Sequence, residues 1–297
     1  MIQKNPHRQP LRYYGSKWRI GPWIASHHPP HYGYISVCGG GANDIFTKPP
    51  SKVEVYNDLD NIVVTFFRVL RDRTEELVKA IELTPYARAE LNQSNETFAA
   101  SGGLEPHQLD ELELARRFFV HCQQGRSSGS SVWKTTWRYL IRDGRDKTLT
   151  DNWNELEHLY ATAGRLKNCQ IECKPALELI ACYDDPKNLF YIDPPYLHNS
   201  RHDTWLKAYR YEWTEADHIE MAQRLQAIEG MAIISGYPTP LYDDLYTTRG
   251  WKMKTITART NANSARTEAI WLSPSVQKQA RQLPLFNQNA QNNGGTQ

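Results

Sequence analysis

The stretch NLFYIDPPYLHNSR, residues 188–201, runs an apolar segment directly into an acid, two prolines and a tyrosine. The letters LFYI have the length and apolar character of a buried strand. Proline donates no backbone hydrogen bond and fixes φ, so Pro194 and Pro195 end that strand at once. Its carboxyl tip therefore carries a carboxylate (Asp193), the free carbonyl of Pro194 and an aromatic ring (Tyr196).

Buried strands alternate with helices along much of the chain. Strands are expected at the start of 32–46 and of 52–61, and within 189–192, 231–237, 251–259 and 267–273. This alternation predicts a mostly parallel α/β sheet of Rossmann-like type, and the last two segments, which alternate in polarity, predict an antiparallel closing pair. Ligands bind beyond the carboxyl ends of the strands in such sheets.

Two segments carry clear helix signals. The first covers 62–82, and its apolar face consists of Val63, Phe66, Phe67 and Leu70. The second covers 214–230, where Thr214 is the expected N-cap, Asp217 follows three residues later and Gly230 is the expected stop.

Residues 83–170 differ from the rest, because they are polar and helix-rich and contain the Gly/Ser loop 123–131. We expect a mainly helical insertion over 69–164 inside a catalytic domain formed by 1–68 and 165–275. Residues 276–297 are rich in glutamine, asparagine and glycine, a composition that predicts a disordered tail.

Bulk composition leaves the class of partner open. The 297 residues are 40% hydrophobic and 23% charged, and the formal net charge is only +2, so a nucleic-acid site would depend on local charge. The five cysteines form no CxxC pair, so we expect no metal site and reduced thiols in a cytoplasmic protein. We expect no signal peptide and no membrane span.

Glycines and an acid point to a nucleoside-bearing ligand. The sequence CGGGA (38–42) follows an expected strand, and glycine lets the backbone approach a ligand closely. Asp58 comes about twenty residues later, the spacing that suits ribose hydroxyls. Two other interpretations remain open: a structural tight turn at the glycines, and a helix N-cap at Asp58, a role for which Asp60 competes.

The tip of the 189–192 strand suits chemistry on an amine of a nucleobase. The lone pair of such an amine is delocalised into the ring, and acceptance of its N–H hydrogens by Asp193 and by the Pro194 carbonyl makes that pair available. Stabilising charge that develops only in the transition state is what accelerates a reaction. Tyr196 can stack on the base. The alternative is a plain Pro-Pro turn.

The expected insertion is locally basic. Between 115 and 147 the basic residues are Arg116, Arg117, Arg126, Lys134, Arg138, Arg142, Arg145 and Lys147, opposed by Asp143 and Asp146. Aromatic residues interleave with them. This mixture suits DNA phosphates and base stacking, and the expected DNA-binding residues are Arg126, Trp133, Lys134, Trp137 and Arg138. The alternative is a solvated helix face with tryptophans in the core.

Several motifs along the chain together resemble those of a known family. The sequences LRYYGSK, GGGA, EVYNDLDN…FFRVLRD, FYIDPPY, SGYPTPLYDDLY and RTEAIWLSP, in this order over roughly 11–274, resemble the motifs of Dam-like, D12-class adenine-N6 DNA methyltransferases, especially phage and prophage members. The resemblance implies a class I methyltransferase fold, a helical DNA-recognition insertion, S-adenosylmethionine as methyl donor, no metal, and an adenine that is flipped out of the duplex.

The resemblance also assigns residues. It implies cofactor contacts by Tyr13, Gly15, Lys17, Gly39, Gly41, Asp58 and Asp193, with Lys17 at the cofactor carboxylate, and a catalytic set of Asp193, Pro194, Pro195 and Tyr196. The chain departs from the family pattern before the glycines. An acid, a proline and an aromatic residue are usual there, and Ser36, Val37 and Cys38 stand in their places.

The tail holds a separate apolar cluster, RQLPLF (281–286). Isolated apolar anchors on a polar tail often bind a partner, and the stretch resembles the pentapeptide that binds the bacterial sliding clamp. The expected contacts are Gln282, Leu283, Leu285 and Phe286. The alternative is that the segment folds back onto the catalytic domain.

The sequence does not exclude two other functions. One is a methyltransferase that acts on RNA or on a protein amide, although amide-modifying relatives commonly carry Asn where this chain has Asp193. The other is a DNA-binding module whose altered glycine motif no longer holds a cofactor.

Overall fold

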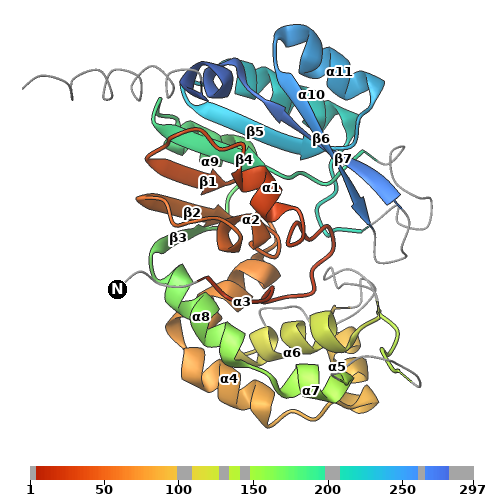
Figure 1. Cartoon of the computed structure of the whole chain (residues 1–297). Coiled ribbons are helices and arrows are strands. Elements are labelled where there is room, and N and C mark those ends of the chain that lie inside the picture. Colours follow the sequence, from red (N-terminus) through yellow and green to blue (C-terminus); the bar gives the residue numbers. More distant parts are fainter. Residues whose placement is uncertain are drawn as a thin grey trace, which may run out of the picture.

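The computed structural model describes residues 5–98, 109–126, 134–140, 148–197, 208–259 and 265–280. Its centre is a seven-stranded sheet with the order β3-β2-β1-β4-β5-β7-β6 (Figure 1). Strands β3, β2, β1, β4 and β5 are parallel, whereas β7 is antiparallel to β5 and β6 is antiparallel to β7. The predicted sheet with its antiparallel closing pair is confirmed.

The strands are β1 (Gly33–Ser36), β2 (Val53–Asn57), β3 (Cys169–Glu172), β4 (Asn188–Ile192), β5 (Met231–Gly236), β6 (Lys252–Arg259) and β7 (Ala265–Leu272). The helices are α1 (Gly21–Ala25), α2 (Asn43–Phe46), α3 (Asn61–Asp72), α4 (Thr74–Glu82), α5 (Arg88–Phe98), α6 (Glu111–Gln124), α7 (Leu149–Asn154), α8 (Glu157–Leu166), α9 (Ala176–Tyr183), α10 (Glu215–Gln226), α11 (Pro240–Leu245) and the 3₁₀ turn η4 (Thr247–Arg249). The edge strand β3 was not predicted, because only Cys169 within it is buried and its apolar signal is weak.

Side chains alternate between two cores on the two faces of the sheet. Tyr34 and Tyr191 belong to the core that α1, α2 and α3 cover, whereas Ile35 and Phe190 belong to the core under α9, α10 and α11. Burial of apolar area on both faces stabilises the central parallel strands and explains why β4 and β5 are mostly apolar.

Helices α4–α7 gather on one side of the sheet with α3 between them and the strands, and α8 lies beside α3 next to β3 (Figure 1). The predicted apolar face of α3, Val63, Phe66, Phe67 and Leu70, is fully buried. The single helix predicted over 62–82 is wrong, because the backbone of Arg73 leaves the helical region (φ −130°, ψ 45°) and separates α3 from α4. The break lets both helices pack on α6.

Helix α10 begins as predicted but ends earlier than predicted. The capping box of α10, Thr214 with Asp217, is confirmed, but the helix ends at Gln226 rather than at Gly230. Gly230 is needed at the entry to β5 instead, where a Cβ would lie 3.0 Å from the ring of Phe190.

The boundaries predicted for the insertion fall inside helices α3 and α8, and the core that covers one face of the sheet continues into the helical region through Phe118 and Trp153. Residues 274–280 are helical and Val276 is buried. The predicted tail therefore begins too early at 276, because these residues pack onto the folded domain. No helix within the described ranges is long and apolar enough to cross a membrane.

Candidate active site

The carboxyl ends of β1, β2 and β4 meet at one edge of the sheet. Their register pairs Ser36 of β1 with Tyr56 of β2 and with Tyr191 of β4. The residues that follow these strands line one pocket, which is partly open to solvent, and residues 13–17 and 209–211 complete its wall.

The pocket brings together the residues predicted to bind a cofactor, because its lining includes Tyr13, Gly15, Lys17, Gly39, Gly41, Asp58 and Asp193. Of the other predicted catalytic residues, Pro195 also lines the pocket, whereas Pro194, which is buried, and Tyr196, which is half-buried, are not among the lining residues. Residues far apart in the sequence thus meet because the parallel sheet places its strand ends side by side.

Asp193 is the central carboxylate of the pocket. Its Oδ2 atom lies 3.0 Å from Nζ of Lys17, and its Oδ1 atom is buried with no hydrogen-bond partner among the described residues. Burial raises the pKa of Asp193, and the attraction of Lys17 opposes that rise. Burial alone would lower the pKa of Lys17, but Asp193 outweighs it and the pKa of Lys17 is raised. One oxygen of Asp193 is therefore held by a cation and the other is available to a donor.

Tyr196 is held by contacts on several sides. Its hydroxyl donates to Oε2 of Glu268 on β7 at 3.0 Å. Its ring makes an edge-to-face contact with Tyr237, with the ring centroids 4.7 Å apart, and the Lys17 ammonium lies 4.8 Å from its centroid. Arg266 donates to the Tyr237 hydroxyl at 3.1 Å. These contacts hold the aromatic ring beside Asp193 in one orientation.

The glycine turn and Asp58 form one unit. Oδ2 of Asp58 accepts from the backbone N–H of Gly40 at 2.8 Å, and Gly40 has a positive φ of 47°. A Cβ at Gly39 would lie 2.4 Å from the ring of Tyr56, so this glycine is required for packing as well. The N-cap of α3 is Asp60, which leaves Asp58 facing the pocket. Burial raises the pKa of Asp58 to about 6.

Sequence reasoning missed two groups of residues in the same wall. The Asn57 side chain donates to the Val37 carbonyl at 2.8 Å and accepts from the Lys174 N–H at 2.8 Å. It thereby ties the ends of β1 and β2 to the loop after β3. Asn43 and Asp44, at the start of α2, also line the pocket. Both residues directly follow the GGGA motif, but nothing in the sequence shows which way their side chains point.

The predicted DNA-binding residues have mixed surroundings. Arg126 and Lys134 are exposed and Arg138 is half-buried, as a DNA-binding role allows, whereas Trp133 lies outside the described residues. Trp137 is half-buried, with its ring centroid 4.7 Å from that of Tyr86, so it packs within the helical region in part as the core alternative predicted. The backbone of Arg126 and Arg138 is fixed by hydrogen bonds to Thr136 and Gln124.

Two arginines of the basic stretch have partners within the protein. Arg116 donates to Glu113 and to Glu90, and Arg117 donates to Glu113. Their charges are neutralised locally by these ion pairs. The sequence count of basic residues therefore overstates the positive charge that this region offers to a partner.

Comparison with known proteins agrees with this geometry. Residues 13–261 match the family model of the D12 class N6 adenine-specific DNA methyltransferases. No curated protein matches the chain.

Proposed function

Since the chain belongs to the D12 class of N6 adenine-specific DNA methyltransferases, we propose that the pocket at the ends of β1, β2 and β4 carries out this reaction, with Asp193 facing the target amine. The chain is a DNA methyltransferase that modifies adenine at N6, and S-adenosylmethionine is the methyl donor that its family implies. The observation that carries the assignment is the state of Asp193, with one oxygen held by Lys17 and the other buried without a partner among the described residues.

The pocket residues fit S-adenosylmethionine, which supplies an electrophilic methyl group on a sulfonium. Asp58 is placed for the ribose hydroxyls, since it follows β2 at the pocket wall. The turn around Gly40 leaves no room for side chains, because a Cβ there would lie 3.0 Å from the ring of Tyr13. Lys17 is a cation in the same wall and matches the carboxylate of the cofactor.

Asp193 activates the adenine amine. Its free Oδ1 atom accepts one N6–H, and the Pro194 carbonyl accepts the other. Both contacts draw the nitrogen lone pair out of the ring as positive charge develops on the amine, which is stabilisation specific to the transition state. Lys17 keeps the carboxylate ionised and oriented before the amine arrives. The bond from nitrogen to the methyl group forms as the methyl–sulfur bond breaks, which leaves a neutral thioether, and the nitrogen then releases one proton to solvent.

Tyr196 holds the base in line. Its ring is already fixed by Glu268 and Tyr237, so it offers a stacking face without a further loss of side-chain freedom. A base inside a duplex cannot reach this pocket, so the adenine enters it flipped out of the helix. Arg126, Lys134 and Arg138 contact the DNA around it.

Methyl transfer from labelled S-adenosylmethionine to unmethylated bacterial DNA, followed by sequencing that reads modified bases, tests this function. The proposal predicts N6-methyladenine at one short recurring sequence. Label found in RNA or in protein but absent from DNA would contradict it. Folded protein that binds DNA but neither binds cofactor nor incorporates label would favour the DNA-binding module.

We further propose that the segment RQLPLF tethers the enzyme to the bacterial sliding clamp. Its residues Gln282, Leu283, Leu285 and Phe286 lie outside the described residues, and the proposal depends on their sequence pattern alone. A pull-down with purified clamp should retain the wild-type chain and lose the Leu285→Ala, Phe286→Ala double variant. Equal retention of both proteins, or of neither, would contradict the tether.

A further inference from the structure

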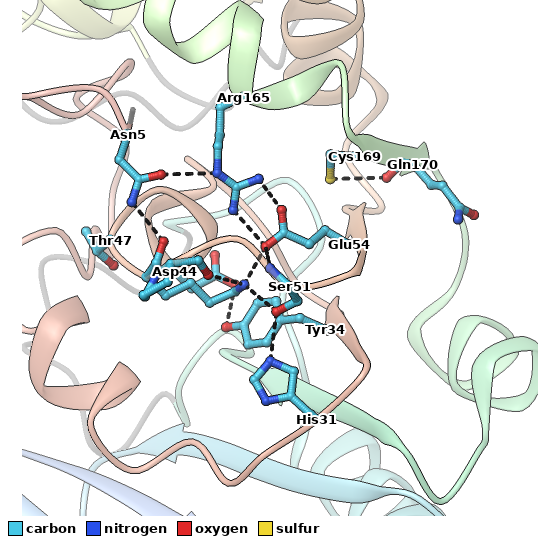
Figure 2. Close-up of polar contacts among 12 residues, drawn as sticks. Asn5, His31, Tyr34, Asp44, Thr47, Ser51, Glu54, Arg165, Cys169 and Gln170 are labelled. Carbon is cyan, nitrogen blue, oxygen red and sulfur yellow. Dashed lines mark hydrogen bonds and ion pairs between the residues drawn. The ribbon is translucent and has the colours of Figure 1, made fainter. Parts of the chain in front are cut away.

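Asp44 is a buried acid in the pocket wall that takes no part in the proposed reaction. It lies in α2, is only 7% exposed and contributes to the lining. Its Oδ2 atom accepts a hydrogen bond from the Tyr34 hydroxyl at 3.0 Å (Figure 2). Among the described residues Asp44 forms no ion pair. A buried carboxylate without a cation is costly and is normally retained only with a compensating partner.

Lys48, the lysine whose charge acts on Asp44, makes its hydrogen bonds to other groups. Lys48 donates to the Pro49 carbonyl at 3.1 Å, to Ser51 Oγ at 2.8 Å and to Oε1 of Glu54. An ammonium has three N–H donors, so these contacts use all of them. Its charge lies over the Tyr34 ring, 4.2 Å from the centroid.

The same cluster continues away from the pocket. Arg165 of α8 donates to both carboxylate oxygens of Glu54, and Asn5 accepts from Arg165 (Figure 2). The charged groups of this cluster, Lys48, Glu54 and Arg165, therefore form their ion pairs with one another. It fixes the Tyr34 ring, and through the Tyr34 hydroxyl it orients Asp44, but it supplies no hydrogen-bond donor to that carboxylate from a cation.

An acceptor without a hydrogen-bond partner lies beside Asp44. Oδ1 of Asn43 is buried in the same wall and has no hydrogen-bond partner among the described residues, whereas the amide nitrogen of Asn43 donates to Ser16. A carboxylate and an amide oxygen on adjacent residues suit a compact cation with several donors. A primary ammonium is such a group, whereas a sulfonium has no N–H to offer.

From this geometry we propose that Asp44, assisted by Asn43, binds the α-ammonium of the cofactor's amino-acid end. The inference rests on the proposed function of the pocket. Asp44 then complements Lys17, which faces the carboxylate of the same amino-acid group, and Asp58 serves the ribose at the other end. The amino-acid end is thus recognised by one acid and one base from different parts of the chain.

The experiment compares two ligands by calorimetry. S-adenosylhomocysteine carries the ammonium and no sulfonium, and S-adenosyl-4-thiobutyrate is the same molecule without the amino group. Asp44→Asn should weaken binding of S-adenosylhomocysteine about ten- to a hundredfold, as expected for a charge-assisted contact. Its affinity for the deaminated ligand should change less than about threefold.

Asp58→Asn is the matched control in the same pocket, and it should weaken both ligands alike. Equal losses for both ligands in Asp44→Asn, or no loss at all, would overturn the inference while leaving the proposed function intact. Failure of the wild-type protein to bind either ligand would overturn both. Thermal unfolding of the ligand-free variant checks the fold, and a marked loss of stability would indicate a structural role for Asp44 instead.

Discussion

Charged residues at the strand ends and in the helical region differ in whether they have ion-pair partners. At the strand ends Asp44 is buried and Asp58 and Asp193 are half-buried, and of these three acids only Asp193 has an ion-pair partner among the described residues. In the helical region Arg116 and Arg117 are paired with neighbouring acids on their own helix and on α5. Acids that are largely withdrawn from solvent, most of them without an ion-pair partner, therefore indicate the functional site. A high density of charged residues in the sequence does not indicate it.

Removal of Lys17 should slow methyl transfer more than a change at any other of these charged groups except Asp193 itself. Lys17→Met keeps the size of the side chain but leaves Asp193 buried without a cation, which favours its protonated form and removes its ability to accept from the amine. We expect methyl transfer to fall about 10²- to 10³-fold. Measurement of the single-turnover rate at saturating DNA and cofactor checks this expectation, and a rate within about threefold of wild type would remove Lys17 from the mechanism.

The pH dependence of the free energy of unfolding should show how much the unpaired carboxylate of Asp44 destabilises the fold. Burial raises its pKa from 3.8 to about 6, with a further contribution from Asp193, so the ionised form is disfavoured in the folded state. The cost is full above about pH 7, falls as the pH drops through 6, and is gone below about pH 4, where the acid is protonated in the folded and unfolded states alike.

Asp44→Asn should therefore raise the free energy of unfolding by about 1–3 kcal/mol at pH 8, as two pKa units imply, and by much less at pH 4. Asparagine still accepts from Tyr34, so the hydrogen bond is kept. Urea denaturation of the ligand-free protein at both pH values measures the difference. A variant less stable than wild type at pH 8 would show that Asp44 has a compensating partner within the fold.

The paired and exposed arginines of the helical region should separate stability from DNA binding. Arg116→Ala breaks contacts with Glu113, Glu90 and Thr84, so we expect it to lower the free energy of unfolding by about 1–3 kcal/mol with little change in DNA affinity. Arg126→Ala should leave stability unchanged.

The expected effect of Arg126→Ala is on DNA instead. Affinity should fall about three- to tenfold, and the slope of log affinity against log salt should decrease by about one, the loss of one phosphate contact. Fluorescence anisotropy over a salt series measures both. If Arg116→Ala shows the larger change in salt slope, the division between paired and exposed arginines is wrong.

The sequence patterns predicted those parts of the site that the topology of the sheet brings together. Parallel strands bring their carboxyl ends together, so the positions of Asp58 and Asp193 in one pocket followed from the order of strands and helices. The role of Asp44 did not, because it depends on which way a four-residue helix turns its side chains and on the commitment of Lys48 to other acceptors. The break at Arg73 escaped for a similar reason, since α3 and α4 bend to pack on α6 rather than in response to a local signal.

The most direct test of the account is the effect of Asp193→Ala on single-turnover methyl transfer, with DNA affinity measured in parallel. We expect transfer to fall at least about 10³-fold while DNA affinity stays within about threefold of wild type. Asp58→Ala is the control, since at saturating cofactor it should retain most of the transfer rate. An Asp193→Ala protein that transfers methyl groups at close to the wild-type rate would contradict the central role given to this carboxylate.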